Sequence, residues 1–375
     1  MLWLSPEQMK RGKKMMRVAA NRAVLRFVNG LSLVMDGSLG PTDATPHEVV
    51  LRRGKLQLRH YRPLGGEALE IGTEVMRTER ARRRVPVVLV PPLMVQPYIY
   101  DLRPEHSMVK TLLRGGFEVF VVDFGIPDRA DAHVRLDDYV LDWLPAALAR
   151  AREVVGRPRL HLGGYCMGAI FALMHTAAHR DEDVQTILSI GAPIDFHKMG
   201  MLSFLARTAH DKVDVLVRRV GNIPGQVSSL GMKMLRPVKS VTRYADLFVN
   251  LWDDEYVKGF SAMSQWSNDF IPYPSEAFQQ FVREFMVENK LKHGGVKFGD
   301  RTVDLKTVRA PILAFAGSTD AIAPVEAARA ILDSVGSDDK DFRLVSGGHV
   351  GVMAGSRAPE EVWRPAVEWL ARHDQ

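Results

Sequence analysis

Residues 160–169 read LHLGGYCMGA, and this stretch decides the fold. A short apolar run leads into the pattern Gly-x-Cys-x-Gly, and a helix-like run follows over residues 169–179. A strand, a sharp turn and a helix in this order raise the side chain at the turn, Cys166, above the end of a sheet. Gly164 and Gly168 allow the close backbone approach that such a turn needs. The alternative is a structural cysteine, because free cysteines often pack in cores as small apolar side chains.

Strands and helices alternate along the rest of the chain. Apolar runs predict strands at residues 85–90, 117–123, 160–162, 186–190, 312–316 and 342–345. Helices are predicted at residues 108–114, 140–155, 169–178, 325–335 and 360–372. This alternation predicts an α/β fold with a mostly parallel central sheet flanked by helices. The cysteine turn narrows the prediction to the α/β-hydrolase fold.

Two segments depart from the alternation. Residues 196–301 are rich in Met and Phe and predict a helical cap inserted into a catalytic core of residues 46–195 and 302–375. Residues 1–45 mix basic and apolar side chains and predict a basic amphipathic helical segment, without the pattern of a secretory signal. Such a segment either lies on a hydrophobic inclusion, a membrane surface or a partner subunit, or packs on its own domain.

A cysteine nucleophile needs a base, and the base needs an orienting acid. In α/β-hydrolases these residues follow in the order nucleophile, acid, histidine, on loops after later strands. Asp320 comes directly after the strand predicted at residues 312–316, and His349 comes directly after the one at 342–345. The sequence therefore predicts a catalytic triad of Cys166, Asp320 and His349.

Other readings of these residues are open. His161, His175 and His179 lie near the cysteine in sequence, but none of them is on a loop that returns to it. Asp320 could instead cap the helix predicted from residue 325.

An oxyanion hole in this fold uses the backbone N–H after the nucleophile and a second N–H from the loop after an earlier strand. The first donor is predicted to be Met167. Pro91 and Pro92 have no N–H to give, so the second donor is predicted at Leu93 or just beyond it.

Composition excludes several classes of protein. The chain has 375 residues, 46% of them hydrophobic, with a formal net charge of +6 and one cysteine. One cysteine excludes an internal disulfide and a cysteine-rich metal site, and it suits a reducing cytoplasm. No metal-ligand spacing, phosphate loop or nucleic-acid motif is found, so we expect no metal, no bound cofactor and no nucleic acid. No apolar run reaches the length of a transmembrane span.

A thiol in place of a serine favours acyl transfer between thioesters over hydrolysis. The acyl-cysteine keeps the reactivity of the thioester for the next acceptor, and a thiol ionises more easily than a hydroxyl. Transfer requires that water is kept out, and the predicted helical cap could exclude it.

Several sequence blocks resemble polyhydroxyalkanoate synthases, over roughly residues 45–370. They are PPL at 91–93, YIYDL at 98–102, VDFGIPD at 122–128, GYCMG at 164–168, WSND at 266–269, VENKL at 287–291, Asp320, and GGH at 347–349. The length of the chain resembles the catalytic subunit of the class III enzymes. The turn at Cys166 is the nucleophile elbow of this fold. The family usually has a second glycine directly after the pattern Gly-x-Cys-x-Gly, where this chain has Ala169.

The resemblance implies a polyester synthase that polymerises (R)-3-hydroxyacyl-CoA and releases CoA. Cys166 would carry the chain and His349 would be the base, while Asp320 would either orient His349 or activate the attacking 3-hydroxyl. It also implies a second synthase subunit. Because each chain has one cysteine, passing the growing polymer between two thiols would require a homodimer, and we expect a location in the cytoplasm at the polyester granule surface. Arginines of residues 77–84 could meet the CoA phosphates. The alternatives are a cysteine-dependent thioesterase or acyltransferase of the same fold, and a non-catalytic granule-binding protein.

Overall fold

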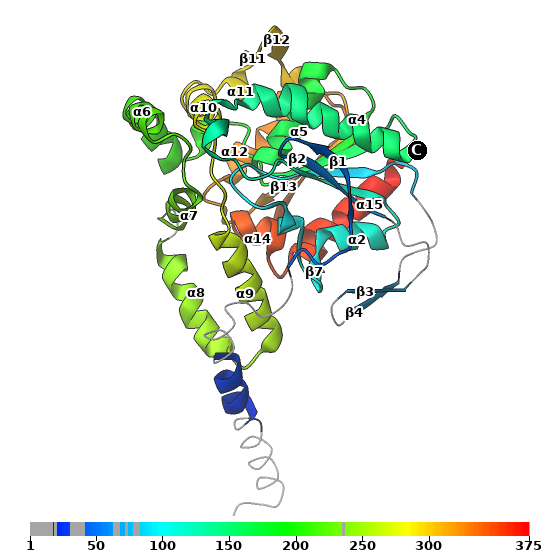
Figure 1. Ribbon diagram of the computed structural model, residues 1–375, viewed down its shortest axis with the longest axis vertical. Coiled ribbons are helices and arrows are strands. Elements are labelled where there is room, and N and C mark those ends of the chain that lie inside the picture. Colours follow the sequence, from blue (N-terminus) through cyan, green and yellow to red (C-terminus); the bar gives the residue numbers. More distant parts are fainter. Residues whose placement is uncertain are drawn as a thin grey trace, which may run out of the picture.

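A single eight-stranded sheet forms the centre of the protein, in the order β1-β2-β8-β5-β9-β10-β13-β14 (Figure 1). The computed structural model describes Val18 and residues 21–30, 42–62, 68–71, 74–77, 83–234 and 237–374. The strands are β1 (Glu48–Arg53), β2 (Leu56–Tyr61), β5 (Val87–Val90), β8 (Val119–Asp123), β9 (Leu160–Tyr165), β10 (Val184–Ile190), β13 (Ile312–Gly317) and β14 (Lys340–Val345). From β8 to β14 all neighbours are parallel, whereas β2 is antiparallel to both β1 and β8. The predicted α/β class and mostly parallel sheet are confirmed.

All six predicted strands are present, and the edge hairpin β1–β2 was not predicted. The inner strands are buried on both faces and so read as continuous apolar runs. β1 has only three apolar residues between charged ends, and β2 alternates apolar with polar residues, so neither strand stands out in the sequence as an apolar run. Three short hairpins were also not predicted: β3 (Ala68–Ile71) with β4 (Glu74–Arg77), β6 (Asp101–Arg103) with β7 (His106–Ser107), and β11 (Val296–Phe298) with β12 (Arg301–Val303).

Helices cover both faces of the sheet and bury one apolar cluster on each. One cluster includes α4 (Leu144–Val155), α5 (Met167–His179), α12 (Val325–Arg329) and α13 (Ile331–Ser334). The other includes α2 (Met108–Arg114), α14 (His349–Ala354) and α15 (Arg364–Arg372). The predicted helices are confirmed, with three differences. Those predicted at residues 140–155 and 360–372 begin with π-helical segments, η3 (Tyr139–Trp143) and η7 (Pro359–Trp363). Residues 325–335 form two short helices because the chain turns at Ala330.

The chain between β10 and β13 is mainly helical. It contains η4 (Phe196–Lys198), α6 (Met201–Val220), α7 (Gly225–Met234), α8 (Pro237–Asn250), α9 (Asp254–Asn268), α10 (Ser275–Gln280), η5 (Phe281–Val287) and α11 (Lys290–His293). In Figure 1, α8 and α9 lie side by side and extend away from the sheet. The segment predicted as a helical cap thus carries the expected helices, together with the hairpin β11–β12 at its end.

Residues 21–30 form a helix at the tip of the α8–α9 pair (Figure 1). The Arg26 guanidinium donates to the Val249 carbonyl at 3.1 Å, and the Asn29 amide donates to the Leu251 carbonyl at 2.7 Å. Most of the segment predicted as a basic amphipathic helix, including residues 1–17 and 31–41, lies outside the described residues. Among the helices that are described, none combines the length and apolar character of a membrane span.

Buried histidines give the folded state a pH dependence. Neither ring nitrogen of His60 has a hydrogen-bond partner within the described ranges, and its ring stacks on Phe120 with the ring centroids 4.3 Å apart. Burial and Arg62 lower the pKa of His60 to about 4, and burial and His373 lower the pKa of His161 to about 3. Both rings are neutral in the folded protein but bind protons near pH 6.5 when the chain unfolds.

We therefore expect the free energy of unfolding to fall as the pH drops below about 6.5 and to keep falling to about pH 4. Each histidine contributes up to about 1.4 kcal/mol per pH unit. Urea denaturation at pH 7.5, 6.0 and 5.0 measures this slope, and His60→Leu should make it shallower. An unchanged midpoint across this range would contradict the prediction.

Candidate active site

Cys166 lies at a strained turn between β9 and α5. Its backbone has φ +52° and ψ −121°, a conformation that residues other than glycine adopt rarely and at a cost of about 1–3 kcal/mol. The Cys166 N–H donates to the Ile190 carbonyl at 2.8 Å, which ties the turn to β10. The turn holds the thiol at the end of β9, partly exposed rather than packed in the core.

The two flanking glycines are required by close backbone contacts. A Cβ atom on Gly168 would lie 1.9 Å from the Val90 carbonyl oxygen, at the end of β5. A Cβ atom on Gly164 would lie 2.3 Å from the backbone nitrogen of Ala169. The elbow and the end of β5 are therefore packed backbone to backbone, as the Gly-x-Cys-x-Gly pattern predicted.

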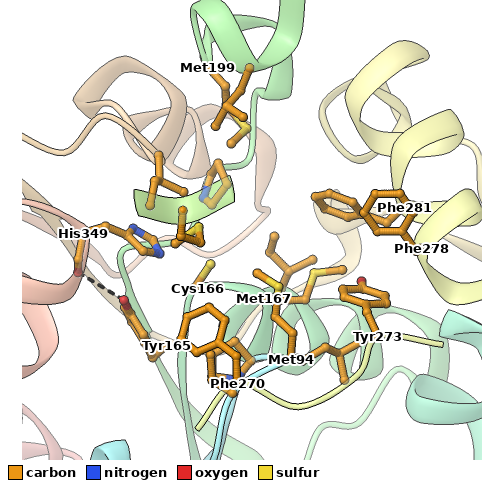
Figure 2. Close-up of a pocket in the computed structure, with 18 of the residues that line it drawn as sticks. Met94, Tyr165, Cys166, Met167, Met199, Phe270, Tyr273, Phe278, Phe281 and His349 are labelled. Atoms are coloured by element: carbon orange, nitrogen blue, oxygen red, sulfur yellow. Dashed lines mark hydrogen bonds between the residues drawn. The ribbon is translucent and has the colours of Figure 1, made fainter. Parts of the chain in front are cut away.

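The thiol opens into an apolar cavity of about 190 Å³ (Figure 2). Methionine and aromatic side chains dominate its wall, and they come both from loops of the sheet and from α6, α7, α9 and η5. The lining residues are Pro92, Leu93, Met94, Val95, Tyr165, Cys166, Met167, Ile170, Pro193, Phe196, Met199, Leu202, Met232, Trp266, Phe270, Tyr273, Phe278, Phe281, Met286, Ile322, His349 and Val350. The helical segment between β10 and β13 therefore supplies much of the wall that surrounds the thiol.

His349 and Asp320 meet beside this cavity. The His349 Nδ1–H donates to Asp320 Oδ2 at 2.8 Å, and both side chains are buried. The other carboxylate oxygen, Oδ1, accepts the N–H groups of Ile322 and Ala323 at 2.8 and 2.9 Å. Asp320 thus stabilises its own turn and binds His349 at the same time. It does not cap α12 as the alternative interpretation predicted, because Pro324 is the residue before that helix and no side chain caps it.

The remaining nitrogen of His349, Nε2, is directed to Cys166. Burial would lower the pKa of His349, but the charges of Cys166 and Asp320 and hydrogen bonds to both outweigh burial and raise it to about 10. Figure 2 shows the imidazole and the thiol on the same wall of the cavity. The Tyr165 hydroxyl donates to the His349 carbonyl at 3.2 Å and helps to fix the histidine loop. The structure brings the three predicted residues together.

The two predicted oxyanion donors also border the cavity. Leu93 and Met167 both line it, and neither N–H donates a hydrogen bond to any of the described residues. The loop that carries Leu93 is held by two contacts to α9 and its end. The Tyr98 hydroxyl donates to Asp269 Oδ2 at 2.6 Å, and Trp266 Nε1 donates to the Gln96 carbonyl at 3.1 Å.

The other histidines near Cys166 in sequence have structural contacts instead. His161 bonds Thr186 Oγ1 at 2.8 Å inside the sheet, and His175 bonds Asp181 at 3.1 Å. The suggested contact of residues 77–84 with CoA phosphates is not supported by Arg83 and Arg84. Both precede β5, at the end of the sheet opposite the cavity, and Arg80 and Arg82 lie outside the described residues.

The sequence did not single out Tyr273, Met199, Met232 or Met286 as cavity residues. Tyr273 and Met199 lie in loops, where no periodic pattern marks them, and only the folded chain brings them to the cavity that Cys166 lines.

Known proteins are similar to this chain in both fold and sequence. Residues 98–356 match the alpha/beta hydrolase fold family. The chain is 30% identical over 344 residues to the poly(3-hydroxyalkanoate) polymerase subunit PhaC of Allochromatium vinosum, covering 91% of this chain and 92% of that protein. The chain belongs to the poly(3-hydroxyalkanoate) polymerase family.

Two further poly(3-hydroxyalkanoate) polymerase subunits are similar to this chain over most of its length. The chain is 32% identical to the poly(3-hydroxyalkanoate) polymerase subunit PhaC of Haloferax mediterranei over 88% of its own length, and it spans 65% of that protein. The PhaC subunit of Haloarcula marismortui is also 32% identical, over 87% of this chain and 68% of the relative.

Solved structures support the fold alone. The monoacylglycerol lipase of Paleococcus ferrophilus superposes with a TM-score of 0.50 at 18% identity, covering 78% of this chain and 96% of the lipase. A thermophilic esterase of Thermogutta terrifontis also gives 0.50, at 16% identity, covering 88% of this chain and all of the esterase.

Proposed function

We propose that this protein polymerises (R)-3-hydroxyacyl groups from CoA thioesters into polyester and releases CoA. The observation that carries the proposal is a cysteine on a strained elbow, beside a buried histidine, facing an apolar cavity. The names of the relatives, poly(3-hydroxyalkanoate) polymerase, support the same reaction. The word subunit in those names supports a further protein partner for this chain as well.

In the first step the Cys166 thiolate attacks the carbonyl carbon of the hydroxyacyl thioester. The C–S bond to CoA breaks, and the CoA thiolate takes the proton that His349 holds on Nε2. The raised pKa of His349 favours this protonated ring beside a thiolate. The N–H groups of Leu93 and Met167 stabilise the oxyanion that forms on the carbonyl oxygen.

In the second step the 3-hydroxyl oxygen of another hydroxyacyl group attacks the carbonyl carbon of the acyl-cysteine. His349 accepts the hydroxyl proton, a new ester bond forms, and the Cys166 thiolate leaves. Asp320 orients His349 in both steps, because each of its carboxylate oxygens is already bound, one to the ring and one to its own turn. The reaction needs no cofactor beyond the CoA carried by the substrate.

The apolar wall favours transfer over hydrolysis. A thioester exposed to water would be lost as free acid, whereas a cavity lined by methionine and aromatic side chains holds water poorly. Its volume of about 190 Å³ exceeds the roughly 150 Å³ of a cavity known to hold a benzene-sized guest, so a short hydroxyacyl group fits. A short acyl chain, that of 3-hydroxybutyryl-CoA, is therefore the appropriate substrate for testing the proposed reaction.

Purified protein incubated with (R)-3-hydroxybutyryl-CoA is expected to release CoA and to form insoluble polyester. A thiol reagent measures the CoA, and chromatography of the methanolysed precipitate measures the polymer. Release of CoA with only free 3-hydroxybutyrate in solution would overturn the polymerase proposal in favour of a thioesterase.

A further inference from the structure

Tyr273 places an unpartnered hydroxyl in the wall of the cavity. The residue is 5% exposed, and its Oη has no hydrogen-bond partner among the residues that the structure describes. The other polar side chains of the wall are engaged: Tyr165 with the His349 carbonyl, Trp266 with the Gln96 carbonyl, and His349 with Asp320 and Cys166. A buried hydroxyl without a partner costs about 1–3 kcal/mol, so a polar ligand atom that reaches it would gain that hydrogen bond.

The backbone and the ring of Tyr273 are both fixed. Tyr273 and Ile223 exchange two backbone hydrogen bonds at 2.9 Å, which join the start of α7 to the loop before α10. The ring packs edge to face on Phe278, with centroids 5.5 Å apart. In Figure 2 the hydroxyl points into the cavity, across from Cys166. The hydroxyl therefore has a defined position before any ligand binds.

Because burial, helped by the charges of Tyr139 and Cys166, raises the pKa of Tyr273 well above its usual value, the phenol keeps its proton and acts as a donor. An acceptor oxygen is therefore its natural partner. An acyl group bound to Cys166 carries its carbonyl oxygen toward Leu93 and Met167, and its remaining oxygen is the 3-hydroxyl. The methionine and phenylalanine side chains around Tyr273 offer that oxygen no other partner.

We propose that Tyr273 Oη donates a hydrogen bond to the 3-hydroxyl oxygen of the acyl group on Cys166, and so selects 3-hydroxyacyl over unsubstituted acyl substrates. This inference rests on the proposed function and adds a specificity-determining residue to it. A site with a fixed polar group discriminates against an analogue that lacks the matching one, because the polar group is then left unpaired.

The test compares acylation by (R)-3-hydroxybutyryl-CoA and by butyryl-CoA, which lacks the hydroxyl and gives only the first CoA release. Rapid-quench measurement of that release gives kcat/KM for each substrate. Tyr273→Phe is expected to lower the ratio of the two values by on the order of ten-fold, mainly through the hydroxyacyl substrate.

Thermal unfolding separates this role from a structural one. Tyr273→Phe removes a hydroxyl that bonds no group in the described part of the chain, so the Tm of the variant should equal or exceed that of the wild type. Tyr61→Phe is the matched control, since Tyr61 is equally buried on β2, lies outside the cavity and contacts Arg59. It should lower Tm and leave the substrate ratio unchanged.

An unchanged ratio in Tyr273→Phe, or a lowered Tm with equal losses on both substrates, would overturn the inference while leaving the polymerase proposal intact. Failure of the wild type to release CoA from either substrate would instead refute the proposed function.

Discussion

Cys166→Ala is expected to abolish polymer formation and CoA release, with a loss on the order of 10⁴-fold or more. The reason is that the acyl group has no other nucleophile to bind: the chain contains one cysteine. Alanine is the appropriate substitution because it keeps a Cβ in the same strained conformation, φ +52°. The backbone of the elbow, and hence the cavity, should remain as in the wild type.

Mass spectrometry of the intact protein provides the direct measurement. After brief mixing with (R)-3-hydroxybutyryl-CoA, the wild type should gain the mass of one or more hydroxybutyryl units, and Cys166→Ala should gain none. The Cys166 side chain makes no capping hydrogen bond to α5, so the Tm of the variant should change little. Residual turnover within ten-fold of the wild type would show that the reaction does not pass through Cys166.

Asp320→Asn is expected to lower activity by about 10⁴-fold without unfolding the protein. The asparagine carbonyl can still accept the N–H groups of Ile322 and Ala323, so the loop is kept. Its NH₂ group, however, faces His349 Nδ1 and donates to it, which moves the ring proton to Nε2. A ring protonated at Nε2 and held there by the amide cannot accept a proton from the thiol or from the 3-hydroxyl.

Whether Asp320→Asn loses the first CoA release, elongation or both distinguishes the two possible roles of Asp320. If Asp320 orients His349, the initial burst of CoA release and the later elongation should both be lost. Loss of elongation with a normal burst would mean that Asp320 activates the attacking hydroxyl directly, contrary to our proposal. His349→Gln is the reference variant, and the double variant should be no worse than either single one, because the residues act as a unit.

The local pattern around Cys166 was sufficient to predict the elbow. Gly164 is required by a contact within the turn and Gly168 by a contact with the end of the neighbouring strand β5, and both requirements appear in the sequence as glycines at these positions. The inner strands were predictable for a similar reason, since burial on both faces leaves a continuous apolar run. The hairpin β1–β2 was missed because only part of each strand is buried, so its apolar signal is diluted by charged residues.

The sequence alone determined the fold class, and it predicted Cys166 as the nucleophile and the chain order of Asp320 and His349, because each of these depends on residue type and on position relative to a strand. Only the tertiary structure decided that both oxygens of Asp320 are occupied, that the helices between β10 and β13 line an apolar cavity, and that Tyr273 lines it with a hydroxyl that has no partner among the described residues. These features depend on the direction of side chains that are distant in sequence, and such directions are set by packing rather than by local pattern.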